Sequence, residues 1–471
     1  MLTRIEVNGF KNLVNFSLDF GPFTCIAGQN GVGKSNIFDV LRFLSLLTDH
    51  TIMDAALLVR GSGVETSNIR DLFQVGKDHR SSSFKIAAEM IVNPNIKDDF
   101  GRSAEASSTY LRYELEIGYE APTPTQLGTL GRLVLLSESL NYITEGEAAS
   151  KLKFPHSARR FRKRAVVNKR RTQSGYISVR LAQDGQTEIV VHQDAGSRGP
   201  GQTAPASTAP RTIVGTSNTS VTPTILAARR EMQKWRFLAL EPSAMRTPDR
   251  FQTEPYVTPN GGHLPAAVYR IVSEAQKRGE DPEAIYASIS SRLAELVSVT
   301  GISIDIDDIR QLLTLEVQEQ SGIRLPAASL SDGTLRFLAL SVLVADSYSQ
   351  GLVCIEEPEN GIHPAKMEQM VNLLKDLAVD PFEEPGLENP FRQVIVATHS
   401  PAFVQLQNRN DVVFATETLL RGNNGNPIRT LKCRPLEKTW RASAGEPTVG
   451  MMTILAYLSK PPGAQLELPG I

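Results

Sequence analysis

The chain has 471 residues, of which 41% are hydrophobic and 21% are charged, with 50 Lys and Arg against 51 Asp and Glu. A chain of this length can bury a sizeable core, and we expect about three domains or lobes. The composition excludes collagen-like, broadly disordered and disulfide-framed proteins. The formal net charge of −1 excludes a uniformly basic coat for nucleic acid, but leaves room for a local basic patch.

The cysteines and the apolar segments indicate the cellular compartment of the protein. Three cysteines fit a reducing compartment, and no Cys or His spacing is typical of a zinc site. The first ten residues alternate apolar and polar side chains and lack the apolar core of a signal peptide. No apolar stretch reaches the ~18 residues of a membrane-spanning helix. We therefore expect a cytoplasmic protein with no membrane partner.

Residues 1–150 are predicted to form a mixed sheet around one crossover helix. Alternating apolar residues predict strands at 2–7 and 16–20, and an apolar run predicts a third strand at 23–27, before a glycine-rich loop. The next segment places Ile37, Leu41 and Leu44 on one helical face. Further strands are expected at 84–92, 110–119 and 133–142.

Residues 151–224 are predicted to be a basic and flexible insertion. The stretch 151–171 holds ten Lys and Arg residues and no Asp or Glu. A hairpin is expected next, with arms at 176–180 and 188–192. Residues 195–224 contain nineteen Gly, Pro, Ser or Thr residues, a composition that buries too little apolar surface to offset its ordering entropy. We therefore expect a flexible loop there.

Residues 225–345 are predicted to form a helical lobe, with helices at 266–278, 282–297 and 334–347. Residues 346–471 alternate again, with strands at 352–355 and 393–398 around a helix at 364–377. Strand, helix and strand with right-handed crossovers indicate a parallel sheet. We expect the two ends of the chain to complete one sheet, with the helical lobe beside it.

The loop after the third predicted strand matches the pattern G-x-x-x-x-G-K-[ST], from Gly28 to Ser35. Glycines let backbone N–H groups point at phosphate oxygens, and the N-terminus of the following helix adds positive potential. In this pattern Lys34 would reach the β- and γ-phosphates and Ser35 would bind Mg²⁺. The alternative is a plain glycine turn between strand and helix. The candidate nucleotide-binding residues are Gly28, Asn30, Gly31, Gly33, Lys34, Ser35 and Asn36.

Two acids end the predicted strand at 352–355. Glu356 is suited to hold the water shell of Mg²⁺, and Glu357 is suited to orient or deprotonate an attacking water. Alone, such a strand end is often a solvated edge. The phosphate loop upstream favours the functional interpretation.

Two further segments end at positions suited to ligand binding. His399 stands at the carboxyl end of a buried strand, where open α/β sheets bind ligands, and it could donate a hydrogen bond to a γ-phosphate. Ser331, Asp332 and Gly333 open the helix at 334–347. They are either a plain helix cap or an anion site for a second nucleotide. For His399 the alternative is a structural role, because a lone histidine at a strand end is usually structural.

Together these segments resemble the ABC-type ATPase head of the SMC, RecF and OLD-like group. GQNGVGKS at 28–35 is similar to its Walker A motif, LSDGT at 330–334 to its signature, and LVCIEEP at 352–358 to its Walker B motif. ENGIHP at 359–364, with Asn360 and His363, resembles its D-loop, and ATHSP at 397–401 its histidine switch. Residues 5–12 resemble the first strand and turn of this group. EPSAMRTP at 241–248 resembles a segment of the bacterial AAA-type ATPases of abortive-infection or toxin systems. Gln74 is a candidate for the Q-loop glutamine.

The resemblance implies an α/β P-loop NTPase fold, in which an ABC-type head with a mixed sheet carries a helical signature lobe. It implies ATP and Mg²⁺ as ligands, and ATP held between Walker A of one copy and Ser331, Asp332 and Gly333 of another, in a homodimer or higher oligomer. Glu357 and His399 would be the catalytic residues, and Ser35 and Glu356 the metal ligands. Glu356 departs from the usual Asp, which is one methylene shorter, so the metal geometry is expected to differ.

The resemblance also implies a cellular role. The long coiled coils of SMC proteins are missing, and the segment after His399 is too short for the nuclease module of some OLD-like relatives. We therefore expect an ATP-hydrolysing protein that controls a separately encoded nuclease or toxin in antiphage defence or DNA maintenance. One alternative is an ATP-bound, slowly hydrolysing scaffold that sequesters a toxin. The other is the ATPase subunit of a transporter, which the long middle region and the signature fit poorly.

The basic stretch leaves its own alternatives open. It could contact phosphates of DNA in a salt-dependent way, bind an acidic protein, or form a solvated face. Its few aromatic residues do not indicate base stacking. The candidate polyanion contacts are Arg159, Arg160, Arg162, Lys163 and Arg164.

Overall fold

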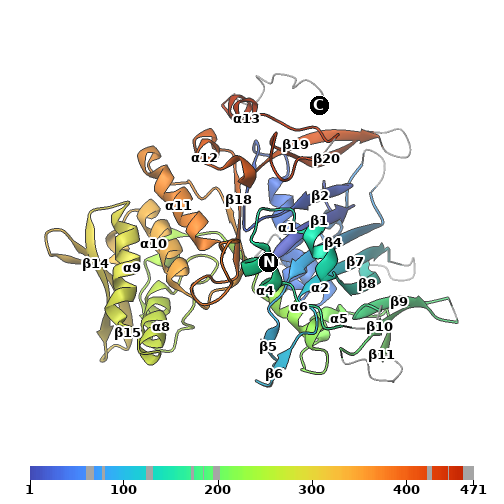
Figure 1. Cartoon of the computed structure of the whole chain (residues 1–471), viewed down its shortest axis with the longest axis horizontal. Helices are drawn as coiled ribbons and strands as arrows, with labels where there is room; N and C mark the ends of the chain where they lie inside the picture. Colours follow the sequence, from blue (N-terminus) through green and yellow to red (C-terminus); the bar gives the residue numbers. More distant parts are fainter. Residues whose placement is uncertain are drawn as a thin grey trace.

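Two large sheets form the body of the chain, and a lobe of helices lies at one side (Figure 1). The computed structural model describes residues 1–59, 68–76, 80–122, 131–170, 174–183, 185–194, 202–421, 427–443 and 445–459. Arg171 and residues 195–201 of the predicted insertion lie outside these residues. None of the helices in the described ranges is both long and apolar enough to cross a membrane.

The first sheet in the described part of the chain is antiparallel, with eight strands in the order β11-β10-β9-β8-β7-β4-β1-β2. Its strands are β1 (Leu2–Asn8), β2 (Phe16–Asp19), β4 (Ser83–Ile91), β7 (Tyr110–Glu120), β8 (Arg132–Tyr142), β9 (Ile177–Leu181), β10 (Thr187–Val191) and β11 (Gln202–Pro205). The predicted strands of residues 1–150 other than 23–27, and the hairpin at 176–192, are therefore confirmed in this sheet. A separate short hairpin consists of β5 (Asn95–Lys97) and β6 (Ser103–Glu105).

The second sheet has six strands in the order β12-β17-β18-β3-β19-β20. Its strands are β12 (Arg236–Leu238), β17 (Gly351–Glu356), β18 (Arg392–Thr398), β3 (Phe23–Ala27), β19 (Val412–Arg421) and β20 (Pro427–Pro435). All neighbours are parallel except β19 and β20. Strands from both ends of the chain thus share one parallel sheet, as the sequence predicts, although β1 and β2 belong to the other sheet.

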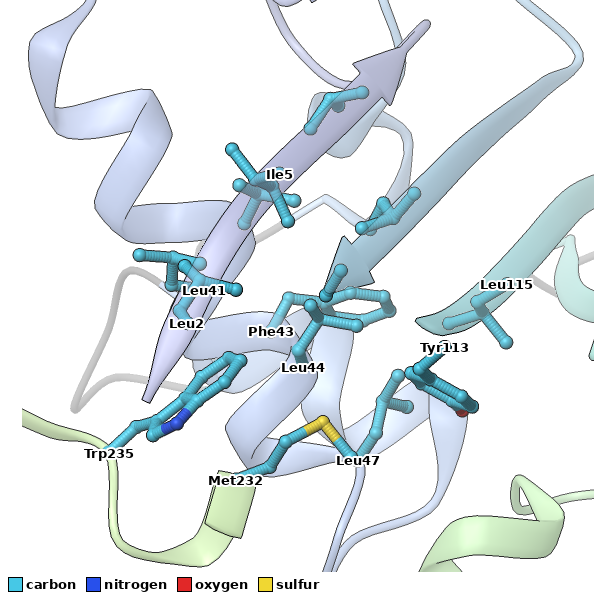
Figure 2. Close-up of a cluster of buried hydrophobic side chains, with 14 of the residues drawn as sticks. Leu2, Ile5, Leu41, Phe43, Leu44, Leu47, Tyr113, Leu115, Met232 and Trp235 are labelled. Atoms are coloured by element: carbon cyan, nitrogen blue, oxygen red, sulfur yellow. The ribbon is translucent and has the colours of Figure 1, made fainter. Parts of the chain in front are cut away.

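Helix α1 (Lys34–Leu46) lies in the core between the two sheets, and Figure 2 shows its Leu41, Phe43 and Leu44 beside Leu2 and Ile5 of β1. The expected helical face is confirmed, because Ile37, Leu41 and Leu44 are fully buried. Met232 of α6 (Pro223–Gln233) and Trp235, which follows this helix, belong to the same cluster. Burial of large apolar side chains stabilises this layer by roughly 1.5–3 kcal/mol each.

The lobe consists of helices around a small sheet. The helices are α7 (Pro242–Met245), α8 (Leu264–Lys277), α9 (Pro282–Ala294) and α10 (Asp332–Ala345), and the strands are β13 (Asp249–Arg250), β14 (Val299–Asp307), β15 (Leu312–Glu319) and β16 (Arg324–Pro326). The three predicted helices are confirmed, whereas the small antiparallel sheet was not predicted. The lobe shares one core with α11 (Met367–Leu377) and with one face of β17 and β18.

The expectation of a flexible loop over residues 195–224 is wrong for its described part. Strand β11 pairs with β10, and helix α5 (Ile213–Thr216) is held by Glu138 of β8, whose carboxylate accepts the N–H groups of Ile213 and Val214 at 2.7 and 3.0 Å. Burial raises the pKa of Glu138 to about 7, although these hydrogen bonds act in the opposite direction. A partner 75 residues away in the sequence therefore orders a segment whose own composition favours a loop.

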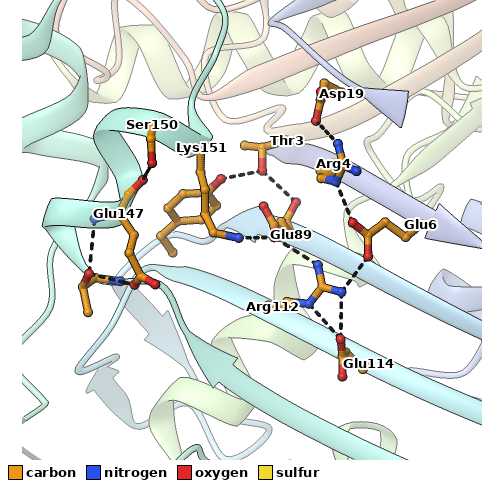
Figure 3. A network of polar contacts seen from close by, with 12 residues as sticks. Thr3, Arg4, Glu6, Asp19, Glu89, Arg112, Glu114, Glu147, Ser150 and Lys151 are labelled. Atoms are coloured by element: carbon orange, nitrogen blue, oxygen red, sulfur yellow. Dashed lines mark hydrogen bonds and ion pairs between the residues drawn. The ribbon is translucent and has the colours of Figure 1, made fainter. Parts of the chain in front are cut away.

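A network of charges covers part of the antiparallel sheet (Figure 3). Arg112 donates to Glu6 at 2.6 Å and to Glu89 at 3.1 Å, and Lys151 donates to Glu89 at 2.6 Å. Burial acts to raise the pKa of Glu6, but the hydrogen bonds from Arg112 and Arg4 outweigh it and lower the pKa to about 2. Lys151, the first cation of the basic stretch, and α3 (Glu145–Lys151) are thus joined to this sheet.

The predicted polyanion contacts divide into two groups. Arg160 pairs with Glu383 at 2.6 Å and Arg164 with Glu384 at 3.1 Å. They lie on a π-helical turn (Ala158–Arg162) and on α4 (Lys163–Ala165), which are anchored by the buried ring of Phe161. Within the described residues no ion pair involves Arg159, Arg162 or Lys163. These three cations are therefore available to a partner.

The buried side chain of Gln393 joins the two sheets. Its Oε1 accepts the N–H of Leu2 at 2.8 Å, and its Nε2 donates to the carbonyl oxygens of Leu2 and Gly21 at 2.7 and 2.8 Å. Leu2 and Gln393 are 391 residues apart in the sequence. One side chain thus satisfies three backbone groups that are buried away from water.

We expect Gln393→Leu to lower the free energy of unfolding by roughly 2–4 kcal/mol, because three buried backbone groups lose their partner while the side-chain volume is kept. Chemical denaturation followed by circular dichroism measures the change. Gln276→Leu, on an exposed face of α8, is the matched control and should leave the stability within about 0.5 kcal/mol. Equal effects of the two substitutions would contradict this role of Gln393.

Candidate nucleotide-binding and catalytic site

The glycine-rich loop connects β3 to α1 and has the backbone that a phosphate cradle needs. Gly31 and Gly33 have φ angles of 84° and 103°, in the left-handed region that favours glycine. A Cβ atom on Gly28 would lie 2.6 Å from the carbonyl oxygen of Ala415, so only glycine fits beside β19. Asn30 and Gly31 are exposed at the tip of the loop. The loop is therefore shaped by backbone constraints at its glycines.

Lys34 opens α1, and its ammonium group lies over the loop. Its Nζ donates to the carbonyl oxygens of Gly28 and Gln29 at 2.7 and 2.8 Å. Burial lowers the pKa of Lys34, while the negative charges of Glu357, Glu356 and Glu359 act to raise it. Glu356, the last residue of β17, and the acids that follow it are thus close enough to act on this ammonium group. The expected juxtaposition of the phosphate loop and the acids is present.

Asn12 supports the loop, and the sequence reasoning did not assign it a role. Its Nδ2 donates to the carbonyl oxygen of Val32 at 3.1 Å, and its Oδ1 accepts from Nδ2 of Asn36 at 2.7 Å. A Cβ on Gly33 would lie 2.2 Å from Asn12 Nδ2. The only signal in the sequence is its position at the end of the strand-and-turn segment 5–12. We interpret Asn12 as the brace that fixes the start of α1.

The two acids after β17 lie at different exposures. Glu356 ends the strand with an exposed side chain, and Glu357 is partly buried with a φ angle of 48°. A left-handed conformation is uncommon for a residue with a Cβ and is often found at functional sites. The N–H of Glu357 donates to the carbonyl oxygen of Ala397 at 2.8 Å, which fixes this turn against β18.

The side chain of Glu357 lies between two partners. Nδ1 of His399 is 2.6 Å from its Oε1, and Nδ2 of Asn360 donates to its Oε2 at 2.9 Å. The structure therefore brings together Glu357, His399 and Asn360, three candidate residues from two segments of the sequence. His363 is not part of this group, because its Nδ1 accepts the N–H of Ala365 at 3.2 Å and caps a short 3-10 turn.

Ser331, Asp332 and Gly333 form the N-terminus of α10. Ser331 caps the helix by accepting the N–H of Thr334 at 3.3 Å, and Asp332 accepts from Arg246 at 2.7 Å. Arg246 follows α7, so the segment 241–248 that resembles a family element holds the signature helix. In Figure 1, α10 and α1 lie on opposite sides of β18.

Gln74 is buried, and its backbone N–H donates to the carbonyl oxygen of Gly9 at 2.9 Å. Its Nε2 has no hydrogen-bond partner among the described residues. The turn after Gly9 leads to Asn12, the brace of the loop. Gln74 is therefore attached to the turn that leads to Asn12, and its role as the Q-loop glutamine stays a prediction.

The donor set fits Mg²⁺ held together with a nucleotide. Within the described residues no group of three or more His, Cys, Asp or Glu could hold a metal ion by itself. Mg²⁺ commonly keeps several waters and is bound by one or two protein oxygens plus substrate phosphates. The hydroxyl of Ser35 and the exposed carboxylate of Glu356 are oxygen donors of this kind, so the residues present fit the ion.

Two protein families match the chain. Residues 226–405 match the family described as "AAA domain, putative AbiEii toxin, Type IV TA system", and residues 4–117 match a second family described as "AAA domain". These segments include the phosphate loop, the signature helix, both acids and His399. Together they cover the elements that build the site.

Short segments of the chain are also similar to curated proteins of known name. The DNA replication and repair protein RecF of Lactococcus lactis subsp. cremoris (strain MG1363) is 38% identical over 65 residues, which cover 14% of this chain and 18% of the relative. RecF of Phocaeicola vulgatus is 40% identical over 52 residues, covering 11% of this chain and 14% of the relative. The chain therefore spans less than a fifth of the length of these two curated relatives.

Among solved structures, the SMC head bound to the C-terminal winged-helix domain of ScpA is 14% identical, with a TM-score of 0.48, and covers 93% of this chain and 99% of that chain. The SMC head domain from Thermotoga maritima is 12% identical with a TM-score of 0.38, over 93% of this chain and 99% of that chain. The two family matches cover the motifs on which the resemblance depends. Residues 4–117 and 226–405 thus match AAA-domain families, and the resemblance of the chain to the SMC/RecF-like ABC-type ATPases is confirmed.

Proposed function

We propose that this chain binds and hydrolyses ATP with Mg²⁺, at sites that two copies of the chain complete together. One observation carries the proposal. The carboxylate of Glu357 accepts a hydrogen bond from Asn360 and lies 2.6 Å from Nδ1 of His399, in a contact that lacks hydrogen-bond geometry, and its charge acts on Lys34 of the phosphate loop. A phosphate-binding lysine and a fixed carboxylate at one edge of a parallel sheet are the parts that ATP hydrolysis needs.

The proposal assigns a role to each residue of the site. Backbone N–H groups of residues 28–35 and the ammonium group of Lys34 bind the β- and γ-phosphates. Ser35 and Glu356 hold Mg²⁺, which supplies charge neutralisation on the phosphates when bound. Glu357 orients the attacking water and accepts its proton, and His399 keeps the carboxylate in place and donates to the γ-phosphate.

The separation of α10 from α1 supports assembly of two copies. Ser331 and the N–H groups of the following turn form a helix N-terminus, which is suited to bind anionic phosphate. In a dimer of this kind, the N-terminus of α10 would face the γ-phosphate bound by a second copy, and Figure 1 shows α10 and α1 on opposite sides of β18. ATP would then hold the two copies together, and hydrolysis would release them.

The cellular role that we propose is control of a separately encoded effector, a nuclease or toxin, in antiphage defence or DNA maintenance. The family description of residues 226–405 names a toxin of type IV toxin–antitoxin systems, and the RecF similarity points to DNA transactions. The alternative is a scaffold that binds ATP and sequesters a toxin with almost no turnover. Steady-state hydrolysis measured with DNA and the partner present separates the two, because the scaffold would show near-zero turnover.

We expect Glu357→Gln to reduce ATP turnover by about 10²–10⁴-fold, because the amide cannot accept a proton from water. ATP binding, followed by equilibrium dialysis, and ATP-dependent assembly, followed by light scattering, should persist. Glu368→Gln, at an exposed position of α11, is the matched control and should keep the wild-type rate. Normal hydrolysis by Glu357→Gln would remove the proposed mechanism.

We propose DNA as a polyanionic partner of Arg159, Arg162 and Lys163, the cations without ion pairs among the described residues. Replacing all three with Ala should reduce the slope of log affinity against log salt by roughly 2–3 for duplex DNA. A mobility-shift titration across a salt series measures it. The triple substitution of Lys277, Arg310 and Arg324 with Ala, in the helical lobe, is the control. An unchanged slope would identify the basic stretch as a solvated face.

A further inference from the structure

Glu359 is a buried acid next to the site to which the sequence motifs assign no task. Its side chain is only 7% exposed, although acids are rarely buried without a reason. Its Oε1 accepts a hydrogen bond from the hydroxyl of Thr398, while its Oε2 has no partner among the described residues. Burial raises the pKa of Glu359, and the neighbouring charge of Glu357 acts in the same direction.

Thr398 connects this acid to the histidine. It is the last residue of β18 and directly precedes His399. Its hydroxyl oxygen accepts the N–H of Ser400 at 2.9 Å while its proton is donated to Glu359. The turn of three residues that carries His399 is therefore fixed by one hydroxyl group, and the orientation of that hydroxyl group depends on Glu359.

The residues after Glu359 contact the signature helix. Arg336 of α10 donates to the carbonyl oxygen of Asn360 at 2.5 Å. The carbonyl oxygen of Gly361 lies so close to Gly333 that a Cβ atom there would be 2.1 Å away. Asn360 in turn donates to Glu357. The segment from Glu359 to Gly361 thus touches the signature helix, the catalytic carboxylate and the turn of the histidine.

We propose that Glu359 is a positioning residue for hydrolysis, which holds His399 beside Glu357 by accepting the hydroxyl of Thr398, and links that pair to the N-terminus of α10. Glu359 acts through Thr398 and does not touch ATP. A contact of a second copy with α10 would in this way be transmitted to the carboxylate that orients water. The inference depends on the proposed ATPase activity and adds a residue to it.

Glu359→Ala removes the acceptor, and Thr398→Val removes the hydroxyl while keeping the side-chain shape. We expect each to lower kcat by about 10-fold or more, with KM for ATP and the affinity for a fluorescent ATP analogue within about 2-fold, since only the transition state needs the aligned pair. The double variant should be no slower than the slower single variant, because both remove the same contact. Thr398→Ser keeps the hydroxyl and should retain at least half of kcat.

Thermal unfolding of the same variants serves as the folding check. A kcat that is unchanged in both single variants, additive losses in the double variant, or an equal loss of kcat in Thr398→Ser would each overturn the role of Glu359. A loss that appears only as weaker ATP binding would overturn it as well. Absence of turnover by the wild-type chain would instead overturn the proposed function, and this inference with it.

Discussion

The position of β18 between β17 and β3 is the constraint on which the candidate site depends. In the parallel register, Glu356 of β17 lies opposite Ala397, and Thr398 lies opposite Ala27, the residue before the phosphate loop. The acids, the histidine and the phosphate loop therefore all lie at the carboxyl ends of neighbouring parallel strands, on the same side of the sheet. A shift of this register by one residue would turn every buried side chain of β18 to the wrong face. Gln393, at the other end of the strand, joins it to β1 and so helps to hold this register.

The same strand also holds the signature helix. The guanidinium group of Arg392, at the start of β18, donates to the carbonyl oxygens of Leu343 and Val344 at the end of α10. Burial lowers the pKa of Arg392 to about 10, with Asp346 acting in the opposite direction. The C-terminus of α10 is thus attached to the beginning of β18, and its N-terminus contacts the segment that follows Glu359. A displacement of α10 would therefore affect both ends of β18, the strand that directly precedes His399.

Local patterns in the sequence were sufficient for most strands of the two large sheets and for the three helices of the lobe, and they supplied the candidate site residues. The motif at Gly28–Ser35, the apolar strands with their terminal acids, and the periodic helices all depend on neighbours in the chain. Contacts between distant residues were not predictable in this way. Glu138 orders α5, Glu383 pairs with Arg160, and Asn12 braces the loop, and in each case the partner is far away in the sequence. Glu359 was missed for the same reason, because its role depends on burial against Thr398.

The central claim is that each ATP site is completed by a second copy, and mixing two inactive variants tests it most directly. Lys34→Ala removes the phosphate-binding ammonium group, and Ser331→Arg blocks the signature helix, so each variant alone should be inactive. In an equimolar mixture, half of the dimers would contain one intact site, and we expect ATP turnover to return to about a quarter of the wild-type rate. A mixture that stays as inactive as its components would contradict composite sites.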